Sequence, residues 1–204
     1  MLDFPGYCFA PGRVCAVIGA NGSGKSTLAR ILAGVLPADA GPFRDVDGVG
    51  YMPQKSYPFR MSLRANLLLN GGRGEGARAD ALLAAFGLEG LAGQGAHRLS
   101  GGETARMALA RLMMRRYGTL ILDEPTAAMD VQSTIRAEEQ ILAYRAETGC
   151  AVILVTHSLK QAGRLADEVL FLHGGRLWEH GAAAALLKSP ARAETRQFLE
   201  YYGL

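Results

Sequence analysis

The sequence predicts an α/β fold with a mainly parallel β-sheet and an inserted helical subdomain. Three apolar runs have the length and composition of buried strands, namely "RVCAVIG", "TLILDEP" and "AVILVTHS". Segments with helical periodicity separate these runs, and strands that alternate with helices are typical of a parallel sheet with helices on both faces. The chain has 204 residues, 49% of them hydrophobic, which suits one domain with a substantial core.

The elements of the α/β core follow from local patterns. The first strand, over residues 13–19, is expected to end at Gly19, and the helix "KSTLARILAGVL" behind it is expected to stop at Pro37. Further helices are expected over residues 131–147 and 159–166. Near the end of the chain, "EVLFLHGGRLWEHG" predicts a strand, a tight turn at its two glycines and a second short strand.

The middle of the chain has a different pattern. From about residue 60 to 115 there is no convincing strand, and three segments have helical periodicity: "MSLRANLLLN", "ARADALLAAFGL" and "GGETARMALARLMMRR". We therefore expect one domain, in which residues 1–59 and about 116–204 form the α/β core and about 60–115 form the helical subdomain.

The net charge, the cysteines and the length of the apolar stretches indicate the class of protein and where it works. The net charge is +3 with acids and bases mixed along the chain, so we expect no nucleic-acid partner. The three cysteines lack metal-ligand spacing, which fits a reducing compartment. No apolar stretch approaches the roughly 20 residues that span a bilayer, and no secretory signal is visible. We expect a cytoplasmic protein that serves a membrane only by docking to another protein.

The stretch "GANGSGKST" joins the first predicted strand to the first predicted helix. Gly19, Gly24, Lys25 and Ser26 satisfy the phosphate-loop pattern G-x-x-x-x-G-K-[ST]. In such a loop the main-chain N–H groups and the helix N-terminus hold phosphate oxygens, the lysine reaches the β- and γ-phosphates, and the serine hydroxyl can bind Mg²⁺. The alternative is a glycine-rich turn that merely precedes a helix. The residues expected to contact nucleotide are Asn21, Gly22, Ser23, Gly24, Lys25, Ser26 and Thr27.

Two acids follow the second predicted strand. Asp123 lies at its carboxyl end, the edge at which open α/β sheets bind ligands, and is expected to hold Mg²⁺. Glu124 is expected to orient and deprotonate the water that attacks the γ-phosphate. The alternative for Glu124 is a solvated loop acid.

The segment "RLSGGETARMALAR" (98–111) resembles the signature sequence of the ATP-binding cassette (ABC) ATPases. Three more motifs match that family in order. Gln54, in "YMPQKSYPF", resembles its glutamine loop, "AAMD" (127–130) its aspartate loop, and His157, in "VTHS", its switch histidine. With the phosphate loop, these motifs extend from residue 19 to 158 and imply a P-loop NTPase core that uses ATP and Mg²⁺.

The resemblance also implies how the motifs act. Two copies of the chain would sandwich two ATP molecules, and Ser100, Gly101, Gly102 and Glu103 of one copy would cover the γ-phosphate bound to the other. Gln54 would contact Mg²⁺ or the attacking water, and His157 would contact the γ-phosphate. Glu103 stands where the family more often has glutamine, and Ala127 where it more often has serine, which could alter coupling across the dimer. The segment between Lys25 and Gln54 is short for the family, which implies only a small antiparallel β subdomain.

The family usually stacks adenine on an aromatic residue well upstream of the loop lysine. Here only Phe4, Tyr7 and Phe9 are available before Lys25. Tyr7 is the candidate for this role, and the alternative is that all three rings only pack.

The resemblance implies an importer-like transport ATPase. It would work at the inner face of the membrane through a separate permease, supplied by an external solute-binding protein. The segment "SYPFRMSLRANLLL" after Gln54 resembles the same region of solute importers. The tail "ALLKSPARAETRQFLEYY" resembles the ends of importers for oxyanions or polar amino acids, so the expected solute is of the tungstate, molybdate or phosphate type. One alternative is a non-transport cassette ATPase of translation or DNA repair. Another is a non-hydrolysing regulatory module, which would be expected to lack Lys25, Glu124 or His157.

Overall fold

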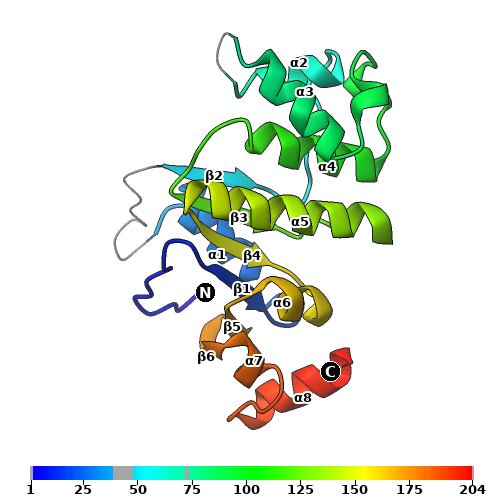
Figure 1. The fold of residues 1–204 in the computed structure, drawn as a ribbon. Helices are drawn as coiled ribbons and strands as arrows, with labels where there is room; N and C mark the ends of the chain where they lie inside the picture. The colour runs from blue at the N-terminus through cyan, green and yellow to red at the C-terminus, as the bar shows by residue number, and fades with distance from the viewer. Residues whose placement is uncertain (1, 39–47, 72–73, 204) are drawn as a thin grey trace. The chain divides into compact units, whose positions relative to one another are not determined.

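The computed structural model describes residues 2–38, 48–71 and 74–203. The chain divides into two compact units (Figure 1), the first comprising residues 1–51, 117–124 and 149–204 and the second 52–116 and 125–148. Part of the stretch expected to hold the antiparallel β subdomain, residues 39–47, lies outside the described residues.

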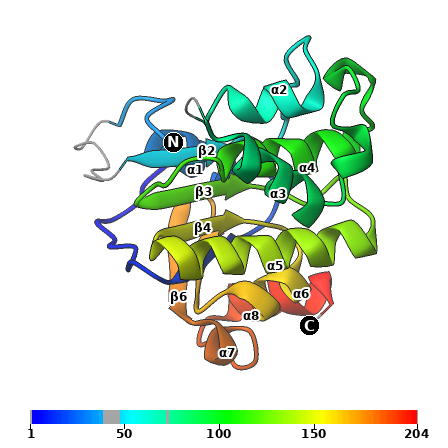
Figure 2. The same ribbon diagram turned by 45° about the horizontal axis from the view of Figure 1, so that its top comes forward.

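A six-stranded sheet is the framework of the first unit, in the order β2-β3-β4-β1-β5-β6. Figure 2 shows β2, β3 and β4 side by side in this sheet. β1 pairs in parallel with β4 and β5, β3 pairs in parallel with β4, and β5 and β6 form an antiparallel hairpin. The predicted α/β class with a mainly parallel sheet is therefore confirmed. The strands are β1 (Val14–Ile18), β2 (Val49–Met52), β3 (Thr119–Asp123), β4 (Ala151–Val155), β5 (Glu168–His173) and β6 (Arg176–Ala182).

The central strands are buried along their whole length. Every residue of β1, β3 and β4 is buried, as expected for apolar runs that are covered on both faces. Val155 pairs with Val17 on one side and with Asp123 on the other, so the carboxyl ends of these three strands meet at the same edge of the sheet. The loops that follow β1, β3 and β4 therefore start side by side.

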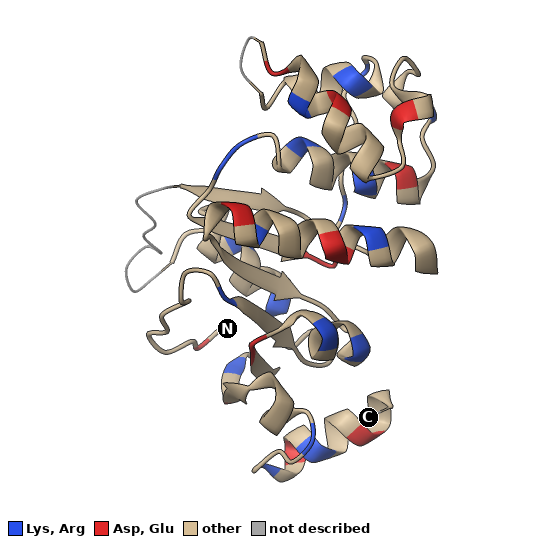
Figure 3. Cartoon of the chain, viewed as in Figure 1, with Lys and Arg blue, Asp and Glu red and all other residues tan. Residues whose placement is uncertain are grey.

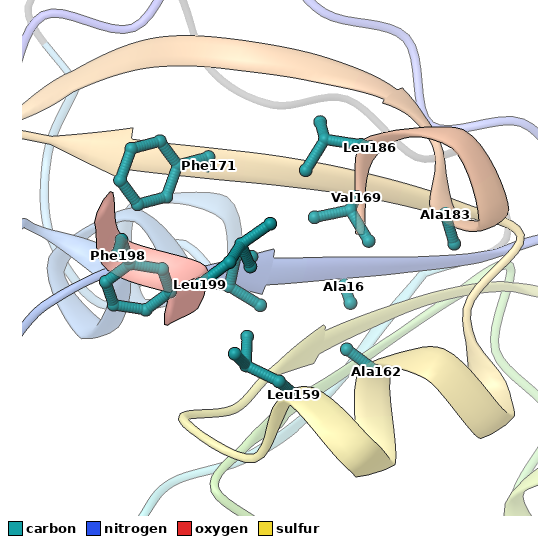
Figure 4. Close-up of a cluster of buried hydrophobic side chains, with 10 residues drawn as sticks. Ala16, Leu159, Ala162, Val169, Phe171, Ala183, Leu186, Phe198 and Leu199 are labelled. Atoms are coloured by element: carbon teal, nitrogen blue, oxygen red, sulfur yellow. The ribbon is translucent and has the colours of Figure 1, made fainter. Parts of the chain in front are cut away.

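Side chains of alternate residues on β1 enter two different cores. Ala16 and Ile18 join a cluster of buried side chains from β5, α6, α7 and α8, which includes Phe171 of β5 (Figure 4). Cys15 and Val17 join a second cluster with Leu28 of α1. Because strand side chains alternate between faces, α6, α7 and α8 cover one face of the sheet and α1 covers the opposite face. The helices are α1 (Lys25–Leu32), α6 (Leu159–Leu165), α7 (Ala183–Leu186) and α8 (Ala193–Tyr202).

The first helix is shorter than expected. It was predicted to continue to Pro37, but α1 ends at Leu32. The N–H groups of Val35 and Leu36 both donate to the carbonyl of Arg30, at 2.8 and 3.1 Å, so the chain has already turned away from the helix axis before the proline. The prediction was wrong because this turn, and not the proline, ends the helix.

The second unit is helical. Among the described residues between 60 and 115 there is no strand, only an isolated bridge between Ser62 and Gly95. The helix α5 (Val131–Thr148) was expected within the α/β core, and the structure groups it with the second unit. The other elements of this unit are α2 (Leu63–Leu68), α3 (Gly76–Ala85), η1 (Glu89–Leu91), η2 (Ala96–Arg98) and α4 (Gly101–Leu112).

Acidic and basic residues are interspersed along the helices of the second unit (Figure 3). Over the part of the chain that the structure describes, no helix has the length and apolar character needed to cross a bilayer.

Candidate functional site

The glycine-rich loop lies between β1 and α1, as predicted. The Lys25 ammonium is buried and folds back over the loop, where Nζ donates to the carbonyl oxygens of Gly19 at 2.8 Å and Ala20 at 3.0 Å. Burial lowers the pKa of Lys25, while the negative charges of Glu124 and Asp123 act in the opposite direction. A buried cation held by main-chain oxygens beside a helix N-terminus suits the binding of a phosphate chain.

Gly19 is required where β1 enters the loop. Its φ is +150°, and a Cβ atom at this position would lie 2.3 Å from the carbonyl oxygen of Leu172 in β5. Because that oxygen belongs to the backbone of a strand, no side-chain rotation relieves the clash. The glycine therefore lets the loop pass close to the sheet.

The remaining loop positions differ in their exposure to solvent. Asn21, Gly22 and Thr27 are exposed, and Gly24 is the N-cap residue of α1. Ser23 is buried, and its hydroxyl has no hydrogen-bond partner among the described residues. Asn21, Gly22 and Thr27 are therefore accessible to a ligand.

Ser26 and Asp123 form a pair of oxygen donors at the carboxyl edge of the sheet. The Ser26 hydroxyl donates to Asp123 Oδ1 at 3.1 Å. Asp123 is fully buried, and its Oδ2 has no hydrogen-bond partner within the described ranges. Burial raises the pKa of Asp123, and the Ser26 hydrogen bond acts against this rise. A buried carboxylate with one oxygen unpaired suits a hard cation.

The Ser26 and Asp123 oxygens suit Mg²⁺ that binds together with a nucleotide better than they suit a metal site built from protein ligands alone. Residues 2–38, 48–71 and 74–203 contain no group of three or more His, Cys, Asp or Glu side chains that could hold a metal. Mg²⁺ commonly takes one or two protein oxygens together with water and substrate phosphates. The donor set is therefore compatible with a cation that binds along with a nucleotide.

Glu124 adopts a strained backbone conformation directly beyond β3. Its φ is +51°, and it is the only non-glycine residue with positive φ among the described residues. Its N–H donates to Val155 O at 2.9 Å, and its Oε2 lies 2.8 Å from His157 Nδ1. The Glu124 side chain is 10% exposed, against 60% for His157. Such strain persists only where the surroundings enforce it, and it is often found at functional sites.

The segment after β4 fixes the position of His157. Thr156 N donates to Val17 O at 3.2 Å, and the Thr156 hydroxyl accepts from Ser158 N at 3.0 Å. Ser158 in turn caps α6, because its hydroxyl accepts from Gln161 N at 3.2 Å. The histidine is therefore held between a strand end and a helix start, facing Glu124.

The second unit contains the signature residues. Ser100 caps α4, and together with Glu103 it forms a capping box. Gly102 approaches the aspartate loop closely, since a Cβ atom on it would lie 2.9 Å from Ala128 O. Gln54 is exposed and also belongs to the second unit. The structure thus brings Lys25, Ser26, Asp123, Glu124 and His157 together in the first unit, and the signature and aspartate loop together in the second.

Tyr7 is engaged in packing. Its hydroxyl donates to Glu168 Oε2 at 2.6 Å, and its ring makes edge contacts with Phe4, Phe9 and His180. All three aromatic rings of this segment pack against the sheet core. These contacts favour the packing alternative over adenine stacking.

Sequence reasoning missed Arg30. Its positive charge lies close enough to Asp123 to lower the pKa of that carboxyl group, against the effect of burial. Arg30 follows Ser26 by one helical turn on α1, and residues with that spacing share a helix face. The i, i+4 spacing from Ser26 is the sequence feature from which Arg30 could have been predicted to lie near the site.

A family profile described as "ABC transporter" matches residues 5–127. The chain belongs to the ABC transporter family. ATP-binding subunits of this family are ATPases, and the chain is accordingly an ATP-binding ATPase. The predicted resemblance to importer subunits is confirmed, because similar curated proteins are named as import ATP-binding proteins.

Three relatives illustrate this similarity. The chain is 36% identical over 189 residues to the zinc import ATP-binding protein ZnuC of Halorhodospira halophila, covering 88% of this chain and 71% of the relative. It is 40% identical to the aliphatic sulfonates import ATP-binding protein SsuB 1 of Pseudomonas fluorescens, covering 97% and 76%. It is 33% identical to the tungstate uptake system ATP-binding protein TupC of Peptoclostridium acidaminophilum, covering 88% and 90%.

The fold of this ABC ATPase is also similar to that of solved structures. The structure of an ATP-binding subunit of an ABC transporter superposes with a TM-score of 0.80, covering 96% of this chain and 90% of that one. The sequence identity is 22%, so this similarity supports the fold alone.

Proposed function

We propose that this ABC ATPase drives the import of a solute through a separate membrane permease. The observation that carries the proposal is the convergence of Lys25, Asp123, Glu124 and His157 at the carboxyl edge of three parallel strands. The names of the import subunits that resemble the chain support the direction of transport. Docking to the permease would hold the chain at the cytoplasmic face of the membrane.

Each residue of the candidate site has a separate role in the proposed mechanism. Lys25 and the loop N–H groups bind the β- and γ-phosphates of ATP. Ser26 and Asp123 would hold Mg²⁺, which would supply positive charge to the phosphate oxygens. Glu124 accepts the proton of the attacking water, and His157, 2.8 Å from the Glu124 carboxylate, orients that carboxylate and contacts the γ-phosphate. Gln54, which belongs to the second unit, would contact Mg²⁺ or the attacking water.

A second copy of the chain completes the proposed site. Ser100, Gly101, Gly102 and Glu103 present the N-terminus of α4, and a helix N-terminus favours an anion. The phosphate loop of the same chain already accounts for one ATP. The α4 N-terminus is therefore proposed to bind the γ-phosphate held by the partner copy, in a homodimer with two ATP molecules.

The proposed solute is an oxyanion such as tungstate, molybdate or phosphate, delivered to the permease by an external binding protein. Tungstate and sulfonate relatives are consistent with this class, whereas the zinc relative is not. Binding of these candidate solutes to the associated binding protein, measured by isothermal calorimetry, tests the assignment. Selective zinc binding there would overturn the oxyanion assignment and leave the ATPase role intact.

Ser100→Arg is expected to lower ATP turnover strongly without weakening ATP binding to the monomer. The arginine places a long side chain at the α4 N-terminus, where the proposed trans contact to the γ-phosphate is made. Loss of such a preorganised contact costs about 10²- to 10³-fold in turnover. Steady-state phosphate release and equilibrium binding of a fluorescent ATP analogue measure the two properties. Ser189→Arg, at an exposed serine outside the signature, is the matched control.

Two outcomes of this experiment would contradict the trans contact. One is loss of ATP binding by a well-folded Ser100→Arg monomer. The other is turnover equal to that of the Ser189→Arg control.

Co-expression with a candidate membrane permease tests the transport role. The proposal predicts that the two proteins purify together in detergent and that the complex turns over ATP faster once reconstituted with loaded solute-binding protein. A chain that purifies without the membrane protein, with turnover unaffected by it, would favour a non-transport cassette ATPase instead.

A further inference from the structure

The N-terminus of α4 is already occupied by a carboxylate of the same chain. Ser100 N donates to Glu103 Oε2 at 2.7 Å, and the Ser100 hydroxyl donates to the same oxygen at 2.8 Å. The hydroxyl oxygen also accepts from Glu103 N, at 3.3 Å. The N–H and the O–H of Ser100 therefore both donate to the Glu103 carboxylate.

This arrangement conflicts with the role proposed for Ser100. A serine hydroxyl has a single O–H to donate, so it cannot donate fully to Glu103 and to a phosphate oxygen of the partner's ATP at the same time. The hydrogen bonds from Ser100 lower the pKa of Glu103, so its carboxylate carries a negative charge at neutral pH. That charge lies at the helix end to which the negative triphosphate must come.

We propose that Glu103 acts as an internal competitor that weakens the ATP-driven closure of the homodimer. The inference rests on the proposed function, since it assumes that the signature binds the partner's ATP. In the open monomer, Glu103 satisfies the donors of Ser100 and the positive end of α4. On closure, Ser100 must exchange this carboxylate for a phosphate oxygen, and the two anions repel each other. Glu103 is a positioning residue that acts through Ser100.

A glutamine at this position would separate the two effects of Glu103. Glutamine also completes a capping box, so Glu103→Gln keeps the helix start but removes the negative charge. Glu103→Ala removes both the charge and the return hydrogen bond to Ser100. A purely structural role and a charge role therefore predict different orders of dimer stability for these two variants.

The test measures dimerisation of the Glu124→Gln protein by sedimentation equilibrium at saturating ATP and Mg²⁺. In this background Glu103→Gln is expected to lower the dimer dissociation constant about three- to tenfold at low salt, because each dimer contains two such sites near a helix dipole. Glu103→Ala is expected to lower it as well. Both gains should shrink at high salt, since the Debye length falls from about 10 Å at 0.1 M to about 3 Å at 1 M.

Glu89→Gln, a change of an exposed acid in the same unit, is the control and is expected to leave dimerisation unchanged. The inference is overturned if Glu103→Gln leaves the dissociation constant unchanged at both salt concentrations, or if Glu103→Ala raises it, since both results indicate a capping role alone. If instead the Glu124→Gln parent stays monomeric with ATP, the proposed dimer itself is wrong. The behaviour of the parent therefore distinguishes the two failures.

Discussion

Replacing Glu124 with glutamine is expected to reduce ATP turnover by about 10²- to 10⁴-fold, the usual contribution of a general base. Glutamine has nearly the same shape and can still accept a hydrogen bond from His157, but it cannot take a proton from water. The side chain of Glu124 is 10% exposed, and Val155 O holds its main-chain N–H, so the substituted amide should keep the same position. ATP affinity should be little changed, because the phosphate loop is intact.

Phosphate release under saturating ATP measures this loss, and binding of a fluorescent ATP analogue measures retention of the nucleotide. Glu200→Gln, which removes an exposed acid of α8, is the control and should keep full turnover. Turnover of the Glu124→Gln protein within a few-fold of the Glu200→Gln protein would show that Glu124 is a solvated loop acid and not the base.

Replacing Lys25 with alanine is expected to weaken ATP binding by about 10- to 100-fold, which is the range for one hydrogen bond to a charged group. The Lys25 ammonium is buried among loop carbonyls, at 2.8 Å from Gly19 O and 3.0 Å from Ala20 O. Its removal takes away the positive charge that the β- and γ-phosphates would meet, and leaves these two carbonyl oxygens without that donor.

Isothermal titration with ATP and Mg²⁺ measures the change in affinity. Lys188→Ala removes an exposed lysine behind α7 and should bind ATP normally. Thermal unfolding without nucleotide checks that the loop still folds in the Lys25→Ala protein. Unchanged ATP affinity in the folded variant would place the nucleotide elsewhere than at this loop.

The fold was predictable because its central strands are continuous apolar runs. β1, β3 and β4 are buried along their whole length, so their sequences contain no alternation that could be mistaken for another element. β2 was not assigned as a separate strand, because its four residues, VGYM, are too few to establish a pattern. The end of α1 was misplaced because Arg30 O accepts two hydrogen bonds that close a turn before the proline, and such bonds leave no mark in periodicity.

The sequence predicted which motifs form the candidate site, but it did not predict most of the atomic contacts between them. The phosphate-loop pattern and the acids behind β3 identified Lys25 and Asp123, and parallel pairing then placed them at one edge of the sheet. The strained backbone of Glu124 could not be predicted, because it depends on its hydrogen bond to Val155 O, more than thirty positions along the chain. The link between Ser100 and Glu103 could have been predicted, since S-x-x-E before a helix is a capping-box pattern.

The most direct test of the ATP-bridged homodimer is complementation between two weakly active variants. Lys25→Ala weakens the phosphate loop and Ser100→Arg disables the signature, so each homodimer is expected to have very low turnover at an ATP concentration that fills the unchanged loop but not the Lys25→Ala loop. A mixed dimer contains one site in which an intact phosphate loop faces an intact signature. The account predicts that ATP turnover reappears on mixing and peaks near equal amounts of the two proteins. No recovery at any ratio, with mixed dimers demonstrated by tag-specific pull-down, would contradict it.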